Sequence, residues 1–409
     1  MTAARRHRRG PRRRPVLRVA ALAATGMLTA GAVAAGATYV RLDSNVERIE
    51  VETLMGTDRP PAPPPPDPSD PRAGLPMNVL LLGSDSREGE NAALGGENDG
   101  VASDTTLVMH LSADRSRVEM ISIPRDSLVD IPACQTTHGI TGAAPEAMFN
   151  SAFARGWATG GDVASAAACA ATTVESLTGV RLDGIVVADF AGFQSMVEAL
   201  GGVSICIPEP VSSPKAGGLT LPAGPQVLDA TQATQLSRAR SGTGWGLELA
   251  SDLSRIDRQQ ALLGAMASTA LDKDLVSDLP RLTGFVSAVT QSLTVSSDLG
   301  SGLELAGIAL SLKDIDPAAI TFTQVPVVDS PTHRYRVEWT SQADVLWAAV
   351  RDDVPTTVAL APDTAAAPPA ARPPSAEAPG TGAPTTSDTP SATPGTTPPE
   401  GEQGAKICP

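Results

Sequence analysis

The stretch that decides the fold is MNVLLLGSDSR, residues 77–87, an apolar run that ends at Gly83 and passes at once into polar residues. Two further apolar runs follow at Thr105–Leu111 and Val118–Ile123. Short apolar runs bounded by turn residues predict buried strands. The polar segment Ser112–Ser116 between the last two runs is typical of the turn of an antiparallel hairpin.

Polar residues lie at the ends of these three predicted strands. If the first two strands also run antiparallel, the loops that carry Asp85, Asp104, Arg125 and Asp126 meet at one edge of the sheet. Two carboxylates from separate loops suit a hard divalent cation, Mg2+ (or Mn2+), that takes its remaining oxygens from water and phosphate. Turns and caps also use Asp, Ser and Gly, so loop chemistry explains either aspartate taken alone.

The chain further on alternates between helix and strand patterns. Helices are predicted at Ser165–Thr178 and Phe190–Leu200, and strands at Gly184–Ala188 and Val203–Ile207. This alternation predicts an α/β domain with helices packed on a sheet. The roughly 280 residues between the proline-rich stretch and the low-complexity tail are enough for one large core.

Arginines gather on two later predicted helices. Asp229 and Gln232 form a capping-box pattern for a helix that delivers Arg238 and Arg240 into a glycine-rich loop, residues 241–246.

Ser251 or Asp252 is a candidate cap for the next helix. Its apolar face is expected to consist of Leu253, Ile256, Leu263, Ala267 and Ala270. Arg255, Arg258 and Gln259 stand at i, i+3 and i+4 and share a different face. Such a face is often simply solvated, but arginines without neighbouring lysines in an acidic domain favour an anion, and their forked geometry suits phosphate.

The first 18 residues hold eight arginines and no acid, and 22 uncharged residues, 19–40, follow. This pattern predicts a cytoplasmic segment 1–18, a transmembrane helix 19–40 and an extracytoplasmic remainder. A signal peptide cleaved near Ala32-Val33-Ala34 is the alternative. We expect a proline-rich linker at 41–76, a catalytic domain at 77–355 and a disordered tail rich in Pro, Thr and Ala at 356–409.

Charge and cysteine content limit the partners. With eight of the 31 basic residues in the first 18, the rest of the chain carries 23 basic and 45 acidic residues, a formal charge of −22 that argues against nucleic acid. The four cysteines have no zinc-ligand spacing, and outside the cell they can oxidise. Among three possible pairings we expect Cys134 with Cys169 and Cys206 with Cys408, with intermolecular pairing through Cys408 as the rival.

These residues together resemble the LytR-CpsA-Psr family of cell-wall glycopolymer transferases. The resemblance rests on seven motifs in order: NVLLLGSDSR (78–87), SDTT (103–106), ISIPRDSLVDIP (121–132), FNSAF (149–153), DFAGFQSMVEALGGV (189–203), RAR (238–240) and SDLSRIDRQQ (251–260). One departure is Ala102, where the family often has an arginine. The short arginine-rich start, the single span and the low-complexity tail look like actinobacterial members.

The resemblance implies an α/β sandwich around a mixed sheet, with a hydrophobic pocket for a polyprenyl chain and a pyrophosphate site at its mouth. It assigns the metal to Asp85 and Asp104. It assigns the pyrophosphate to Arg87, Arg125, Arg238, Arg240, Arg255, Arg258 and Gln259. Asp126 either orients Arg125 or acts as a base. The residues that would line the lipid pocket, or equally form an ordinary core face, are Phe190, Phe193, Met196, Val197 and Leu200.

The function that this resemblance implies is transfer of a glycopolymer from a polyprenyl pyrophosphate carrier to peptidoglycan at the membrane. A metal and arginines would stabilise the charge that develops on the phosphates, with Arg125, Asp126, Arg238 and Arg240 as the catalytic candidates. Two alternatives stay open: a hydrolase acting on the same lipid, and a non-catalytic wall-binding or regulatory protein.

Overall fold

The computed structural model describes residues 36, 40–64, 74–84, 101–249, 252–271, 278–312 and 315–360 of the 409-residue chain. Several predicted positions lie outside these ranges: Asp85, Arg87, Ser251, Cys408 and nearly all of the expected span at 19–40. Within the described part of the chain, no helix has the length and apolar character needed to cross a membrane.

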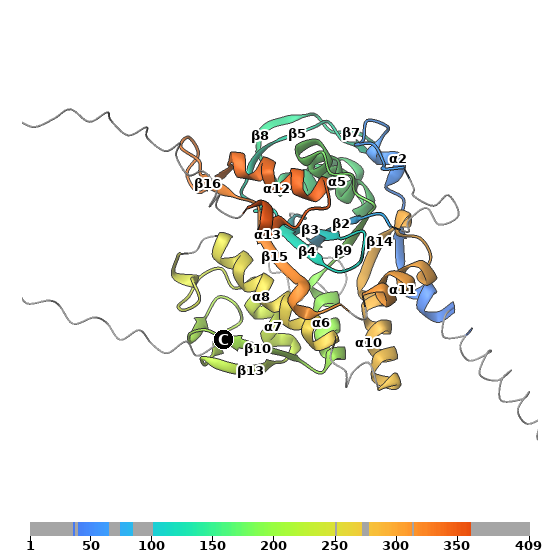
Figure 1. The fold of residues 1–409 in the computed structure, drawn as a ribbon. Coiled ribbons are helices and arrows are strands. Elements are labelled where there is room, and N and C mark those ends of the chain that lie inside the picture. Colours follow the sequence, from blue (N-terminus) through green and yellow to red (C-terminus); the bar gives the residue numbers. More distant parts are fainter. Residues whose placement is uncertain are drawn as a thin grey trace, which may run out of the picture.

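A seven-stranded sheet forms the centre of the molecule (Figure 1). Its strands, in spatial order, are β1 (Glu47–Ile49), β14 (Leu293–Ser296), β9 (Gly184–Ala188), β2 (Met77–Ser84), β3 (Ser103–Leu111), β4 (Val118–Ser122) and β15 (Ile320–Gln324). The pairs β2–β3, β3–β4 and β14–β9 are antiparallel, and the pairs β2–β9, β1–β14 and β4–β15 are parallel. The sheet is therefore mixed, and the expected hairpin and antiparallel first pair are confirmed.

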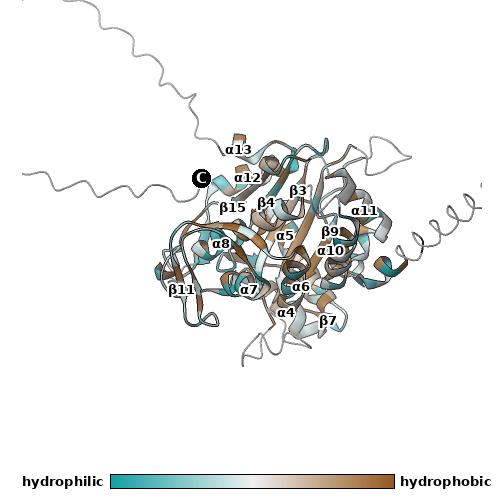
Figure 2. Cartoon of the chain, turned by 90° about the horizontal axis from the view of Figure 1, so that it is seen from below, coloured by the Kyte–Doolittle hydropathy of each residue, from teal (hydrophilic) through white to brown (hydrophobic). Residues whose placement is uncertain are grey.

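Helices cover both faces of this sheet, because successive strand residues point to opposite sides. Leu80 and Leu82 pack with one layer, whereas Val79 and Leu81 pack with the other. The first layer holds α2 (Glu52–Met55), α4 (Ser151–Gly160), α5 (Val163–Thr178) and α12 (Ser341–Arg351). The second holds α8 (Asp252–Ala270) and α11 (Gly302–Ser311), with α6 (Phe190–Leu200) and α10 (Leu279–Ser292) beside them (Figure 1). Figure 2 shows β3, β4 and α5 as largely hydrophobic elements in the interior.

A smaller unit packs beneath α6 and α8 and has its own apolar core. It consists of the pairs β10 (Val203–Ile207) with β13 (Gly224–Leu228) and β11 (Val211–Ser213) with β12 (Leu219–Leu221), and of α7 (Ala230–Arg238). The predicted strand at 203–207 thus exists but belongs to this unit. Among the residues that the structure describes, the buried apolar side chains form three clusters rather than the one core expected from the sequence.

Shorter elements connect these layers. They are β5 (Leu128–Ile131), β6 (Gln135–Thr136), β7 (Gly139–Ile140), β8 (Ala144–Met148), β16 (Val327–Asp329), β17 (Val337–Trp339), α13 (Thr356–Ala359) and the 3-10 turns η2 (Leu247–Leu249), η3 (Ser297–Leu299) and η4 (Pro317–Ala319).

The folded domain extends beyond both predicted boundaries. The expected linker contains β1, which pairs with β14, and Arg59, which forms a buried ion pair with Glu175 (2.7 Å). At the other end, the backbone and hydroxyl of Thr356 donate to buried Glu119 (2.8 and 2.7 Å), so α13 belongs to the fold rather than to the tail. The boundaries of the folded domain are set by tertiary contacts of this kind, and a high content of proline or alanine does not locate them.

Cys134 and Cys169 form a disulfide that joins the segment after β5 to α5 across 35 residues of sequence. Cys206 on β10 is also disulfide-bonded. Its expected partner, Cys408, lies outside the described residues.

Candidate active site

A cavity of about 840 Å³ lies between the sheet and the helices α6 and α8. Neighbouring strands supply its floor: Leu81 is paired with Leu107 and Val186, and Gly83 is paired with Thr105 and Ala188. These residues all line the cavity. The antiparallel and parallel pairings of β2 therefore place one face of three strands beneath a single space.

Helix α8 gives this cavity two unlike ends. Arg255 and Gln259 line it from the first half of the helix, and Leu262, Leu263 and Met266 line it from the second half. At 1.5 Å per residue, Arg255 and Met266 are separated by roughly 16 Å along the helix axis. The cavity is thus charged at one end and apolar at the other.

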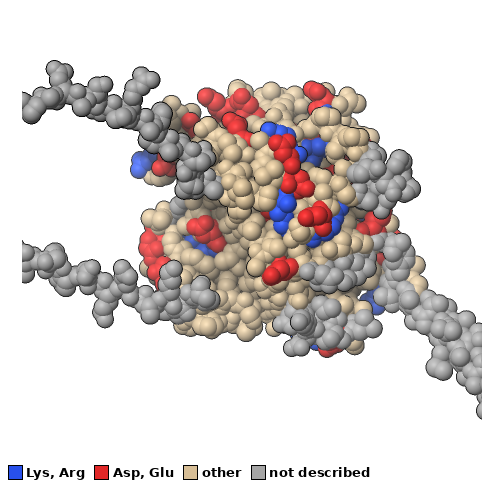
Figure 3. Space-filling model, viewed as in Figure 1, with Lys and Arg blue, Asp and Glu red and all other residues tan. Residues whose placement is uncertain are grey.

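The charged end is organised around the carboxylate of Asp104, at the start of β3. Arg125 Nη1 donates to Asp104 Oδ1 (2.8 Å), and Arg240 Nη2 donates to Asp104 Oδ2. Arg255 Nη1 lies 3.7 Å from Oδ1, and its Nη2 donates to the Asp104 carbonyl oxygen (2.9 Å). We call Arg125, Arg240 and Arg255 the arginine cluster. Figure 3 shows basic and acidic side chains together in the hollow over the start of α8.

Asp252 supports this cluster from behind and was missed as a functional residue. It accepts from Arg255 Nη2 one helical turn away, lies 3.2 Å from Arg125 Nε, and accepts from the Arg125 backbone N–H (3.2 Å). From the sequence, Asp252 was predicted only as a candidate helix cap. Its spacing of three residues from Arg255 is the signal that indicates this ion pair.

The electrostatics of the charged end are strongly coupled. Burial raises the pKa of Asp104, but Arg255, Arg240 and Arg125 outweigh it and hold the pKa below its usual value. For Asp252 burial prevails over Arg255 and Arg125, so its pKa is raised. Burial likewise lowers the pKa of Arg255 in spite of both aspartates. Asp104 is therefore an anionic residue surrounded by cations.

The Nε atoms of Arg125 and Arg255 differ in their surroundings. Both are buried without a hydrogen bond to the described residues, but Arg125 Nε lies within ion-pair distance of Asp252 (3.2 Å) and Asp126 (3.6 Å). A buried donor without a hydrogen bond costs free energy, so Arg255 Nε retains capacity for an additional acceptor.

Arg258 does not line the cavity and has another role. Its side chain is 1% exposed and donates to the carbonyl oxygens of Trp245 (2.7 Å) and Ala239 (2.8 Å). Burial, then Arg255, lowers its pKa to about 10. Arg258 thereby fixes both ends of the loop that follows Arg240. Within this loop Gly244 has φ 82°, and a Cβ there would meet the Pro210 carbonyl oxygen, so only glycine fits.

Other predicted residues do reach the cavity. Arg238 at the end of α7 lines it and stacks over the Phe190 ring at 4.8 Å. Gln259 also lines it and donates to the Ser237 carbonyl oxygen (3.2 Å). Asp126 adjoins the cluster through Arg125 Nε (3.6 Å) without lining the cavity.

The predicted lipid-pocket residues divide by their position along α6. Phe190, Phe193 and Met196 line the cavity. Val197 and Leu200 instead pack in the core of the smaller unit. Both alternatives that the sequence left open are thus realised on one helix: the first three residues reach the cavity, and the last two, nearer the end of the helix, are buried in the core.

Asn150, just before α4, also lines the cavity and was not singled out, although the motif FNSAF was. Its backbone N–H donates to the Arg125 carbonyl oxygen (3.2 Å). Ser84 and Thr105 line the same region.

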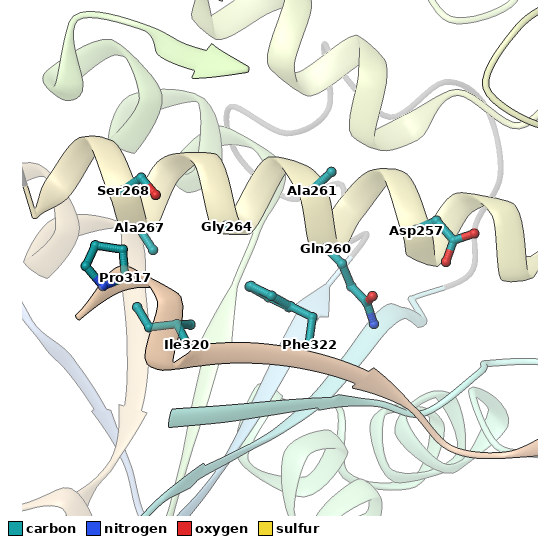
Figure 4. Close-up of a pocket in the computed structure, with 9 residues that line it drawn as sticks. All are labelled: Asp257, Gln260, Ala261, Gly264, Ala267, Ser268, Pro317, Ile320 and Phe322. Atoms are coloured by element: carbon teal, nitrogen blue, oxygen red, sulfur yellow. The ribbon is translucent and has the colours of Figure 1, made fainter. Parts of the chain in front are cut away.

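A second cavity of about 410 Å³ lies between α8 and the edge strand β15. Figure 4 shows Ile320 and Phe322 of β15 facing the small residues Gly264 and Ala267 of α8. Its polar members are few, and Gln260 is engaged by Ser122 Oγ (2.8 Å). Because no charged groups converge there, the first cavity is the candidate active site.

Of the two predicted metal ligands, Asp85 and Asp104, the described residues of the charged end include Asp104. Asp104 offers hard oxygens, and its lowered pKa keeps them ionised, which suits Mg2+ or Mn2+. Both oxygens accept hydrogen bonds from arginines in this structure. Among the described residues no group of three or more His, Cys, Asp or Glu could hold a metal, and Asp85 lies outside them.

Comparison with known proteins gives a family match over residues 46–351, to the model described as the LytR_cpsA_psr family. The chain is 28% identical over 267 residues to the cell wall biosynthesis protein LcpA of Corynebacterium glutamicum, covering 61% of this chain and 50% of LcpA. It is 32% identical over 245 residues to the probable cell wall biosynthesis protein LcpB of that organism, covering 58% and 52%. The chain thus spans about half the length of these two relatives.

A further relative is TagT of Bacillus subtilis, a polyisoprenyl-teichoic acid–peptidoglycan teichoic acid transferase, with 27% identity covering 60% of this chain and 67% of TagT. Among solved structures, the LytR-Csp2A-Psr enzyme from Actinomyces oris superposes with a TM-score of 0.53 at 19% identity, covering 75% of this chain and 96% of that one. TagT bound to LIIa-WTA superposes with a TM-score of 0.51 at 22% identity, covering 76% and 99%. These likenesses establish the same fold.

Proposed function

The chain belongs to the LytR-CpsA-Psr family, and from this premise we propose that it is a phosphotransferase that moves a cell-wall glycopolymer from a polyprenyl pyrophosphate carrier to peptidoglycan. One observation carries the proposal: a single cavity is charged at one end and apolar at the other. A polyprenyl pyrophosphate has the same division. The transferase activity in the name of TagT agrees with this assignment.

The arginine cluster binds the pyrophosphate. Arg125, Arg240 and Arg255 now converge on Asp104, and their fixed geometry suits the oxygens of a phosphate that arrives between them. Arg238 adds a fourth cation beside Phe190, where the charged and apolar linings meet. The prenyl chain then follows the apolar half of α8 past Phe193, Met196 and Met266.

Transfer forms one bond and breaks two. The oxygen of a peptidoglycan hydroxyl attacks the phosphorus that carries the sugar polymer, and the bond from that phosphorus to the bridging oxygen breaks. Polyprenyl phosphate leaves, and the proton of the hydroxyl passes to solvent. Negative charge grows on the oxygens that the arginine cluster contacts, so fixed donors there stabilise the transition state. Asp126 lies 3.6 Å from Arg125 Nε and 3.5 Å from Arg336 Nη1, and we assign to it the orientation of Arg125.

Asp104, with Asp85, would hold Mg2+ (or Mn2+). When bound, such an ion supplies further neutralisation of phosphate charge. The arginine-rich start and apolar stretch 1–40 would keep the domain on the outer side of the membrane, beside its lipid substrate.

The test uses a donor lipid radiolabelled in its sugar, incubated with the full chain, with and without peptidoglycan. We expect label bound covalently to peptidoglycan, one polyprenyl phosphate released for each glycopolymer chain transferred, and loss of both in a chelator. Label released as free sugar phosphate while peptidoglycan is present would identify a hydrolase instead. Full turnover in the chelator would remove the metal from the proposal without affecting the arginines.

A further inference from the structure

The loop between β16 and β17, residues 330–336, holds one aromatic ring in solvent. Tyr335 is 75% exposed, in a chain whose aromatic content is 3%. The loop around it is well ordered by hydrogen bonds: the Ser330 backbone N–H donates to the Arg336 carbonyl oxygen (2.8 Å), and the Ser330 hydroxyl donates to Glu338 (2.7 Å) and accepts from the His333 backbone N–H (3.1 Å). The hairpin therefore orders the backbone that carries the ring.

The backbone of Tyr335 is strained as well. Its φ is 63°, in the left-handed region, where a bulky side chain is disfavoured and glycine or asparagine would be relaxed. Strain of this kind persists only where the surroundings enforce it, and it is frequent at ligand-binding positions. Here the hydrogen bonds of the Ser330 network enforce it.

Chemistry and position make this ring a binding surface. The Arg334 guanidinium lies 4.6 Å from the ring centroid and covers one face with a cation, and the high exposure of Tyr335 leaves ring surface open. A flat ring with a polar tip offers stacking to the C–H face of a sugar, and the neighbouring arginine offers hydrogen bonds to carboxylate or amide oxygens.

The loop is also attached directly to the candidate active site. Arg336 Nη1 lies 3.5 Å from Asp126 Oδ1, and the Val337 backbone N–H donates to the Asp126 carbonyl oxygen (3.2 Å). Trp339 Nε1 donates to the hydroxyl of Ser127 (3.1 Å). Asp126 and Ser127 follow Arg125 of the arginine cluster in sequence. A ligand bound at Tyr335 is thereby held at a fixed position relative to the arginine cluster.

We propose that Arg334 and Tyr335 form a subsite for the glycan strand of peptidoglycan, the acceptor of the transfer. The identification of the ligand as the acceptor rests on the proposed function. The ring stacks on one sugar of the strand, and Arg334 pairs with oxygen groups carried on the neighbouring positions. The acceptor, not the donor, is assigned here because the loop is fastened to Asp126 beside Arg125 and lies outside the lining of the cavity that the donor lipid occupies.

The test measures binding of the full chain to purified peptidoglycan sacculi by co-sedimentation, without donor or metal. Tyr335→Gly keeps the left-handed backbone and removes the ring, so we expect about tenfold weaker binding and an unchanged or higher unfolding temperature. Tyr335→Phe keeps the ring, and we expect binding within about twofold of the parent chain. Arg334→Ala should weaken sacculus binding by several-fold.

Two results would overturn the subsite. One is sacculus binding by Tyr335→Gly equal to that of the parent. The other is a loss by Tyr335→Gly confined to soluble wall polymer free of peptidoglycan, which would assign the ring to the donor. Because sacculus binding requires no turnover, its outcome is independent of the donor-lipid assay that judges the proposed function.

Discussion

The two ends of the active-site cavity are built in different ways. At the charged end, Asp104, Arg125, Arg240 and Arg255 come from four separate segments and meet through individual hydrogen bonds and ion pairs. At the apolar end, α6 and α8 supply side chains that recur at helical spacing, and no single contact defines the lining. Losing a single charged hydrogen bond at the first end should cost much binding free energy. At the apolar end, the binding free energy depends on the total apolar area that is buried, so a single side chain contributes less.

Asp104→Asn should have the largest effect, because it keeps the shape of the charged end and removes the charge on which three arginines converge. We expect the rate of polyprenyl phosphate release to fall about 100-fold or more, a loss of ~3 kcal/mol of transition-state stabilisation. Rates are compared at saturating donor lipid. The matched control is Asp257→Asn on α8, which lines the other cavity and should retain the parent rate. Parent turnover in Asp104→Asn would remove this residue from the reaction.

Arg258→Ala tests a residue of α8 that stabilises the fold, in contrast to Arg255 of the same helix, which lines the cavity. It removes two charge-assisted hydrogen bonds to backbone carbonyl groups, so the free energy of unfolding should fall by ~3 kcal/mol. Arg258→Lys restores one of them and should recover about half of the loss. Urea unfolding measures both. An unchanged midpoint for the alanine variant would mean that the loop after Arg240 is held by other contacts.

Met266→Ala tests the apolar end and should have a smaller effect. Removing part of one lining side chain should weaken binding of the donor lipid about five- to tenfold, in keeping with ~1 kcal/mol of lost apolar contact. The loss should be the same for an uncharged polyprenol, because Met266 contacts only the chain. Met266→Leu conserves volume and serves as the control. Losses seen only with the pyrophosphate lipid would contradict the separation of the two ends.

A change in ionic strength should produce the smallest change in affinity for the pyrophosphate lipid. Arg240 is 53% exposed, so salt can screen its attraction to pyrophosphate. Raising the salt concentration to about 0.5 M should weaken binding of the pyrophosphate lipid a few-fold and leave polyprenol binding unchanged. Equal weakening of both ligands would point to a general effect of salt on the lipids.

The same contrast governs what the sequence could predict. Strands β2 to β4 and their antiparallel order followed from apolar runs and one polar turn, and the capping box of α7 followed from Asp229 and Gln232. Strand β1 was missed, since three residues give no periodicity. The partner of β10 is β13, a choice that tertiary packing makes and that no local pattern records.

Site residues show the same limit. The sequence placed Arg255 and Arg258 on one helix face, and both are buried as neighbours on α8. One meets Asp104 and Asp252, while the other meets two carbonyl groups, because each extends into a different surrounding structure. Helical spacing predicts a shared face but not the partner at the end of a long side chain.

The most direct test of the account compares Arg240→Ala with the parent chain for two ligands, a polyprenyl pyrophosphate and the polyprenol of the same length. Arg240 donates to Asp104 from an exposed position, so its removal leaves the buried core untouched. We predict that affinity for the pyrophosphate lipid falls about tenfold or more while affinity for the polyprenol is unchanged. Equal losses for the two ligands, or none for either, would contradict the claim that the charged end of the cavity binds pyrophosphate.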